Sequence, residues 1–234
     1  YVSWNGHFGS GVASLAGCIS RHRELFIDSE EPIRACADRS VHVAGFFFDA
    51  ARDEFDDSAT PHRDAHRSLA QALLKGTAEH LHLLDRADEL CDDPPWLRGL
   101  NAEVHSGYGV GGGESRWDLF AAMGFHLGSE ILADDEFTVL DTRLRKGMPG
   151  LVDDLLSLRV EIAGEFHPAY YWVGIHSGLG GSVEQDHFAW AVRGVREALE
   201  VTPVADRVDA REAVLLGFER FVDVHRRFFD AVLT

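Results

Sequence analysis

Several carboxylate and imidazole side chains interrupt the apolar helical patterns of this sequence. Glu184 and His187 are three residues apart, which places both side chains on adjacent turns of one helix face. A Glu-x-x-His spacing occurs in helical bundles that bind metal ions through carboxylate and imidazole ligands. Glu103 and Glu161 each follow an apolar residue by one turn on two other predicted helices. Since burying several carboxylates together is unfavourable without a compensating cation or proton, the pattern predicts an interior metal or acid–base site.

Further polar residues are predicted to line the same interior cavity and to bind a substrate. Arg116 offers a guanidinium group for a carboxylate, sulfate or phosphate. Glu165 extends one predicted helix face by a turn, and Tyr170 belongs to an aromatic run that suits either the core or a pocket wall. His105 and His176 are additional imidazole candidates, although either alone is also typical of a loop or surface histidine.

The elements that would position these residues are all predicted to be helices. Apolar residues recur with a spacing close to 3.6, and no segment shows the alternation of a half-buried strand. The predicted helices cover residues 31–56, 62–90, 96–106, 115–127, 134–146, 150–166, 183–200 and 207–232. The sequence therefore predicts an all-α bundle of seven to nine helices that forms one domain over residues 1–234.

The composition narrows the classes of partner and the compartment. Lys and Arg number 22 and Asp and Glu number 39, which gives a formal net charge of −17. Nucleic acids and anionic membranes both require basic surface, so we expect neither as a partner. The three cysteines include no Cys-x-x-Cys pair, which predicts neither a disulfide framework nor a structural zinc site. With no secretory signal and no bilayer-spanning apolar stretch, we expect a cytoplasmic protein.

Four runs of residues together resemble the heme-oxygenase-like iron-containing redox enzymes, which are all-helical non-heme di-iron oxidases and oxygenases. The matching runs are Asn101-Ala102-Glu103 with the glycine-rich loop after it, Asp118-Leu119-Phe120-Ala121-Ala122-Met123-Gly124, Glu161 with Pro168 and Tyr170, and Glu184-x-x-His187. The resemblance implies a heme-oxygenase-like bundle that binds iron. It implies the following metal ligands, which would also be the catalytic residues: Glu103, Glu161, Glu184 and His187.

The chain departs from the pattern of that family at several ligand positions. The family has a histidine just before the Asp-Leu-Phe run and a His-x-x-x-Asp-x-x-His series on its last ligand helix. The residues found there are Ser115-Arg116-Trp117 and, depending on the register, either Gly180 or both Ala191 and Gly194. These replacements leave a metal-free enzyme on the same scaffold as an open alternative.

Three functions follow from these observations. The first is a small-molecule biosynthetic enzyme that uses iron to oxidise an amine- or amino-acid-derived metabolite. The second is a metal-independent enzyme of specialised, antibiotic-type metabolism. It would catalyse an intramolecular substitution or ring closure with a Glu or His general base, while cationic groups hold the anionic leaving group. The third is a non-catalytic helical partner subunit. A homodimer or a complex with a small partner subunit is compatible with each of them.

Overall fold

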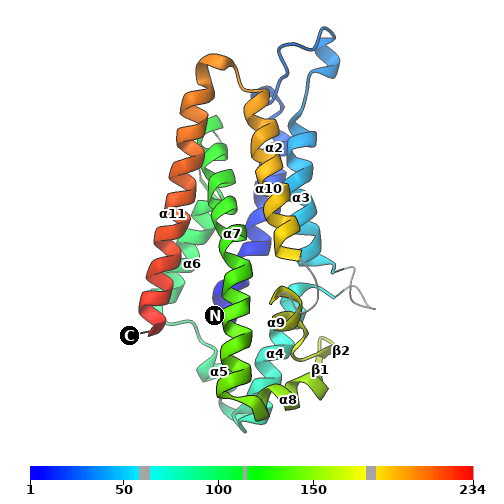
Figure 1. The fold of residues 1–234 in the computed structure, drawn as a ribbon, viewed down its shortest axis with the longest axis vertical. Coiled ribbons are helices and arrows are strands. Elements are labelled where there is room, and N and C mark those ends of the chain that lie inside the picture. The colour runs from blue at the N-terminus through cyan, green and yellow to red at the C-terminus, as the bar shows by residue number, and fades with distance from the viewer. Residues whose placement is uncertain (58–63, 113–114, 178–182, 234) are drawn as a thin grey trace. The chain divides into compact units, whose positions relative to one another are not determined.

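The structure, a computed structural model, describes residues 1–57, 64–112, 115–177 and 183–233. Helices dominate these ranges, which confirms the predicted all-α class (Figure 1). The α-helices are α1 (Val2–Asn5), α2 (Phe8–Arg21), α3 (Ser40–Phe55), α4 (His66–His80), α5 (Ala87–Leu90), α6 (Pro95–Gly107), α7 (Arg116–Gly147), α8 (Pro149–Ser157), α9 (Tyr171–His176), α10 (Val183–Glu200) and α11 (Arg207–Leu233). The short 3-10 turns are η1 (Arg23–Leu25), η2 (Arg34–Cys36), η3 (Leu84–Arg86) and η4 (Val204–Asp206).

The predicted helix over residues 150–166 is wrong in its second half. Helix α8 ends at Ser157, and an antiparallel hairpin of β1 (Arg159–Ile162) and β2 (Glu165–Pro168) follows it. Ala163 and Gly164 connect the strands with φ values of 54° and 89°. Two consecutive residues with positive φ are typical of the tight turn that matches the twist of a hairpin.

The spacing of the apolar residues in this segment is compatible with both a helix and a hairpin. Leu158 and Ile162 are four residues apart, which is one helical turn but also an even number of strand positions. A side chain therefore returns to the same face in both structures. Only the alternate exposure within β1, where Val160 is buried between exposed neighbours, distinguishes the strand from a helix.

Helix boundaries elsewhere also differ from the predictions. The two helices predicted over 115–127 and 134–146 are one continuous helix, α7. Gly128, at the predicted break, lies inside this helix. A glycine is needed here because a Cβ would lie 2.7 Å from the Phe221 ring, so a larger residue would not fit. Helix α3 begins at Ser40 rather than near residue 31, and Asp38 accepts hydrogen bonds from the Ser40 amide and hydroxyl at 2.9 and 2.7 Å.

The described residues form two compact units. The first contains Tyr1–Gly6, Arg52–Pro94 and Leu132–Gln185, and the second contains His7–Ala51, Pro95–Ile131 and Asp186–Thr234. The prediction of one domain over residues 1–234 stays a prediction. None of the helices in the described ranges combines the length and the apolar character that crossing a bilayer requires.

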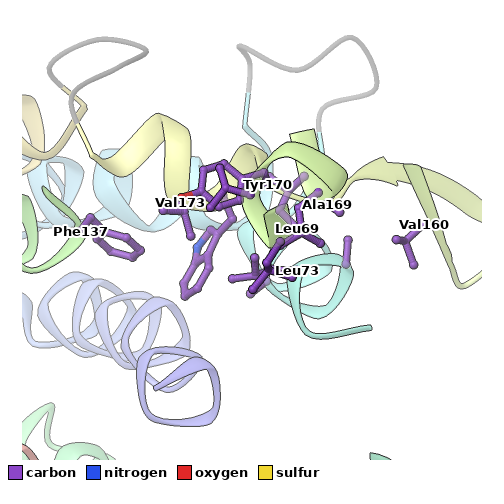
Figure 2. Close-up of a cluster of buried hydrophobic side chains, with 13 residues drawn as sticks. Leu69, Leu73, Phe137, Val160, Ala169, Tyr170 and Val173 are labelled. Carbon is purple, nitrogen blue, oxygen red and sulfur yellow. The ribbon is translucent and has the colours of Figure 1, made fainter. Parts of the chain in front are cut away.

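The core of the first unit forms around α4. This helix contacts α1, α8, α9 and both strands of the hairpin. Figure 2 shows Leu69 and Leu73 of α4 among buried side chains from the hairpin and α9. The remaining labelled members of this cluster are Phe137, Val160, Ala169, Tyr170 and Val173. The hairpin is therefore an integral layer of this core rather than a surface excursion.

The second unit contains α2, α6 and α11, the larger parts of α3 and α10, and the first half of α7. Helix α6 lies beside α11 (Figure 1). Helices α7 and α11 approach each other closely in this unit. A Cβ on Gly124 would overlap the carbonyl oxygen of Val214, and a Cβ on Gly217 would overlap that of Ala121. Two glycines on facing helices thus let the two backbones pack against each other directly.

Candidate functional site

The predicted ligand Glu161 and the predicted substrate-binding Glu165 lie on the hairpin instead of on an inward helix face. Both side chains are exposed to solvent. Glu161 follows the buried Val160 on β1, and successive side chains of a strand point to opposite faces. Its backbone oxygen, rather than its carboxylate, accepts a hydrogen bond from the Lys75 ammonium at 2.9 Å. The expectation that Glu161 faces the interior is therefore wrong.

The predicted ligand Glu103 is paired with an arginine. Arg227 donates a hydrogen bond to Glu103 Oε1 at 3.0 Å and makes a second contact to Oε2. The side chain of Glu103 is 41% exposed. The hydrogen bond from Arg227 lowers the pKa of Glu103, so the guanidinium already compensates its charge. This glutamate does not require a metal ion.

The other predicted substrate-binding residues have partners within their own units. Arg116 donates to Asp206 at 2.8 Å, and the rings of His7 and His105 are joined through a 2.9 Å contact between Nδ1 and Nε2. Helix α10 contains the fourth predicted ligand, Glu184, whose side chain lies outside the described residues.

Tyr170 is a core residue whose hydroxyl donates to Asp141 Oδ1 at 2.7 Å. Arg145 donates to both oxygens of the same carboxylate at 2.9 Å, and its guanidinium lies 5.3 Å from the Tyr170 ring centre. Burial and then the hydrogen bond to Asp141 raise the pKa of Tyr170, which keeps the phenol protonated. These contacts indicate a role in folding.

We expect Tyr170→Phe to lower the free energy of unfolding by about 1 kcal/mol, the usual contribution of one intramolecular hydrogen bond. The ring keeps its packing in this variant, while Asp141 keeps Arg145 as a partner. Urea denaturation followed by circular dichroism measures the change. If the variant is as stable as the wild type, water replaces the Tyr170 hydroxyl as the hydrogen-bond partner of Asp141 without a loss of stability.

His187 is buried in the second unit, where it lies near a carboxylate that also contacts a second histidine. Glu130 Oε2 is 3.6 Å from His187 Nδ1, and Glu130 Oε1 is 3.2 Å from His126 Nδ1. The Tyr108 hydroxyl is 3.3 Å from the same His126 nitrogen and 2.9 Å from Ser129 Oγ. His126 and Glu130 are separated by one turn of α7, at the point where the sequence predicts a break between two helices.

A different group of side chains in the first unit has the donors of a metal site. Glu54, His66 and His176 each offer one ligand atom, and these atoms lie within 4.8 Å of one another. Both histidines are buried and Glu54 is partly exposed. Glu54 Oε1 is 3.3 Å from His66 Nδ1, and the two imidazole rings meet edge to face at 4.6 Å. We call these three residues the Glu54 group.

Helix ends position all three residues. Glu54 is the penultimate residue of α3, His66 is the first residue of α4, and His176 is the last residue of α9. Three helix termini of the first unit therefore converge on one point. Only His176 is among the candidates predicted from the sequence, because that prediction follows apolar stripes along helices and neglects their ends.

The surroundings of His176 fix the orientation of its ring. Its Nδ1 donates a hydrogen bond to the backbone oxygen of Trp172 at 2.6 Å, which assigns the proton to Nδ1 and directs the lone pair of Nε2 away from it. The Phe137 ring stacks on the imidazole with centres 4.5 Å apart. Histidines that bind a metal ion through one ring nitrogen usually donate the N–H of the other ring nitrogen to a carbonyl or carboxylate oxygen.

A second carboxylate faces His66. Asp57 is buried, and its Oδ2 lies 3.6 Å from His66 Nε2. Burial alone would lower the pKa of His66, but the charges of Glu54 and Asp57 outweigh it and raise the pKa to about 10. In the absence of a metal, His66 is therefore an imidazolium held between two carboxylates.

The donor set of the Glu54 group fits a divalent cation, whereas the set implied by the family resemblance does not. Among the described residues, the buried His66 Nδ1 makes no hydrogen bond despite the nearby Glu54 oxygen. Adjacent donor atoms on one metal ion with bonds of about 2.0–2.2 Å lie about 2.8–3.3 Å apart, depending on whether the ion is six- or four-coordinate. The 3.3 Å between Glu54 Oε1 and His66 Nδ1 is at the upper end of that range. Glu103 is already paired with Arg227, and Glu161 is exposed.

Comparisons with protein-family models, curated proteins and solved structures give no significant match. The resemblance to heme-oxygenase-like redox enzymes therefore stays a prediction.

Proposed function

We propose that this chain is a non-heme iron enzyme that oxidises a small amine- or amino-acid-derived metabolite, with the Glu54 group as its metal ligands. One observation supports the proposal above the others: two buried imidazoles and one carboxylate offer ligand atoms within 4.8 Å of one another. Two histidines and one carboxylate form the ligand triad typical of iron(II) oxygenases, in which other coordination positions remain open. A bound iron(II) would supply the activation of dioxygen.

The residues around the ligands support binding of a cation. Glu54 and Asp57 together contribute two negative charges, which match a divalent ion once His66 has lost its proton. Phe137 and Trp172 are both buried in the first unit, and their rings lie 4.5 and 6.0 Å from that of His176. These rings exclude water from one side of the imidazole and hold its orientation.

The local charge supports an amine as the substrate class. Burial raises the pKa of the Tyr171 hydroxyl, and the charges of Asp57 and Asp64 raise it further. Tyr171 therefore lies in a negative field produced by two buried carboxylates. Where a bound cation does not already balance these two carboxylates, their charge attracts an ammonium group and repels an anion. The phenol can in addition donate or accept one hydrogen bond at the substrate.

One observation favours the metal-independent alternative. An imidazolium between Glu54 and Asp57 leaves the group with its charges already paired, so it is stable without a metal ion. In that enzyme, which would close a ring in antibiotic-type metabolism, the protonated His66 would hold Glu54 and Asp57 in position. Glu54, which is partly exposed, would act as the base toward the attacking amine.

The two functions are distinguished by the iron content of variants. The full chain is stripped with a chelator and reloaded anaerobically with iron(II), and bound iron is measured after dialysis. We expect His176→Ala and Glu54→Ala to lose one ion per chain or to weaken its binding at least about 100-fold, because each removes a direct ligand. Glu161→Ala, which removes an exposed carboxylate of the same unit, is the matched control and should bind like the wild type.

Three results would be decisive. Loss of iron in the Glu54-group variants but not in Glu161→Ala supports the iron enzyme. A wild-type chain that binds no iron supports the metal-independent enzyme. Iron that remains bound in all variants would show that the Glu54 group is not the metal site.

A further inference from the structure

We propose that Asp64, Glu165 and His167 form a second divalent-cation site that fastens the β1–β2 hairpin to the segment preceding α4. Each of the three residues offers one ligand atom, and these atoms lie within 4.8 Å of one another. All three belong to the first unit. The site shares no residue with the Glu54 group, so it does not depend on the proposed function. We call these three residues the Asp64 group.

The hairpin brings two of the donors to one face. Glu165 and His167 are two residues apart on β2, and side chains with this spacing point to the same side of a strand. His167 is paired with Val160 across the hairpin, and both residues are buried. An imidazole thus takes a position on the inner face of the hairpin that would normally be apolar.

The third donor comes from a segment distant in sequence. Asp64 lies two residues before α4 and is 6% exposed, and its backbone oxygen accepts a hydrogen bond from the Asp57 amide at 3.0 Å. A buried carboxylate is unfavourable unless a positive charge compensates it, and at Asp64 that charge would come from a protonated His167 or from a bound cation. The ion would connect this segment to β2, which lies about a hundred residues later in the chain.

The geometry at His167 suits a cation between the donors. His167 Nδ1 lies 2.8 Å from Asp64 Oδ1, yet within the described residues this buried nitrogen makes no hydrogen bond. A short contact with poor hydrogen-bond direction is expected when both atoms bind a third atom. Adjacent ligands of a six-coordinate ion with bonds of about 2.0–2.2 Å lie about 2.8–3.1 Å apart.

The donor types select the class of ion. One imidazole and two carboxylates suit zinc or manganese(II), whereas magnesium and calcium prefer oxygen ligands alone. The two carboxylates balance the charge of a divalent ion when His167 is neutral. The carboxylate of Glu165 is exposed, so the ion can enter from solvent and water can complete its coordination.

Zinc titration of the chelator-stripped full chain tests the site. Equilibrium dialysis should give two zinc ions per wild-type chain, one at each group. We expect one ion in His167→Ala and one in His176→Ala, and none in the double variant. Glu165→Gln changes an exposed side chain and leaves the buried residues of the hairpin in place. It should weaken the binding of one of the two zinc ions at least about 10-fold. Glu161→Ala, on the opposite strand, is the control and should bind two.

Hydrogen exchange identifies which ion fastens the hairpin. Zinc should slow exchange of the amides in residues 159–168 in the wild type and in His176→Ala, but not in Glu165→Gln. Equal zinc binding by the wild type and Glu165→Gln, with equal exchange, would overturn the second site. Loss of the Asp64-group ion alone leaves the proposed function intact, and loss of the His176-dependent ion alone leaves this inference intact.

Discussion

The free energy of unfolding of the metal-free protein is expected to fall as the pH rises from about 6.5 to about 10, and His66→Gln should remove most of this fall. Burial alone lowers the pKa of His66, but Glu54 and Asp57 raise it from 6.5 to about 10. A group whose pKa is higher in the folded protein stabilises it fully below the unfolded pKa. That contribution is lost as the pH rises through the folded pKa.

The size of the effect follows from the same linkage. One proton bound only in the folded state changes the stability by about 1.4 kcal/mol per pH unit. We therefore expect the free energy of unfolding of the wild type to exceed that of His66→Gln by less at pH 9.5 than at pH 6.5. The decrease in this difference should be at least about 2 kcal/mol. Guanidinium denaturation in the presence of a chelator measures both proteins across this range.

A matched histidine separates this effect from the general pH response of an acidic protein. His42→Gln, at a half-exposed position on α3, is the matched control variant. A difference in unfolding free energy between wild type and His66→Gln that is constant with pH would show that His66 binds no more protons in the folded state than in the unfolded state. The imidazolium, and with it the metal-independent alternative, would then be excluded.

The same titration bears on the metal proposal, because a metal ion and a proton compete for His66. Iron affinity should therefore increase with pH over the range in which the unloaded protein loses stability. If iron binding is independent of pH while the stability of the unloaded protein is not, His66 is an ion-pair residue and not a ligand.

The helical class could be predicted because long apolar repeats specify it. The predicted helix over residues 207–232 is α11, Arg207–Leu233, whose buried residues recur at helical spacing from Ala210 to Phe228. The hairpin could not be predicted in the same way, because a four-residue spacing keeps a side chain on one face of both a helix and a strand. A short strand gives too few residues to decide the period.

Most residues of the candidate sites could not be predicted, for a different reason. Searching for polar residues on apolar stripes finds positions in the middle of helices, such as Glu103. The Glu54 group instead uses helix ends, and the Asp64 group uses a hairpin and the residues before α4. Tertiary packing decides which helix ends come together. The spacing of residues along the chain therefore does not indicate these positions. The sequence contains 13 histidines, which leaves metal or acid–base chemistry open without locating it.

Gly217→Ala is expected to destabilise the second unit by about 3 kcal/mol or more, or to prevent its folding, because overpacking against backbone is not relieved by a rotamer change. A methyl group at this position would overlap the Ala121 carbonyl of α7, and the facing Gly124 has the same relation to Val214. The helices would have to separate along their whole contact.

Gly99→Ala on α6 is the control: among the described residues, no atom beyond the backbone of its own helix lies within 4 Å of the added methyl group. This variant should be neutral or more stable by up to about 1 kcal/mol. Thermal unfolding followed by circular dichroism compares the two variants. If both alanines are tolerated equally, α7 and α11 do not pack backbone to backbone.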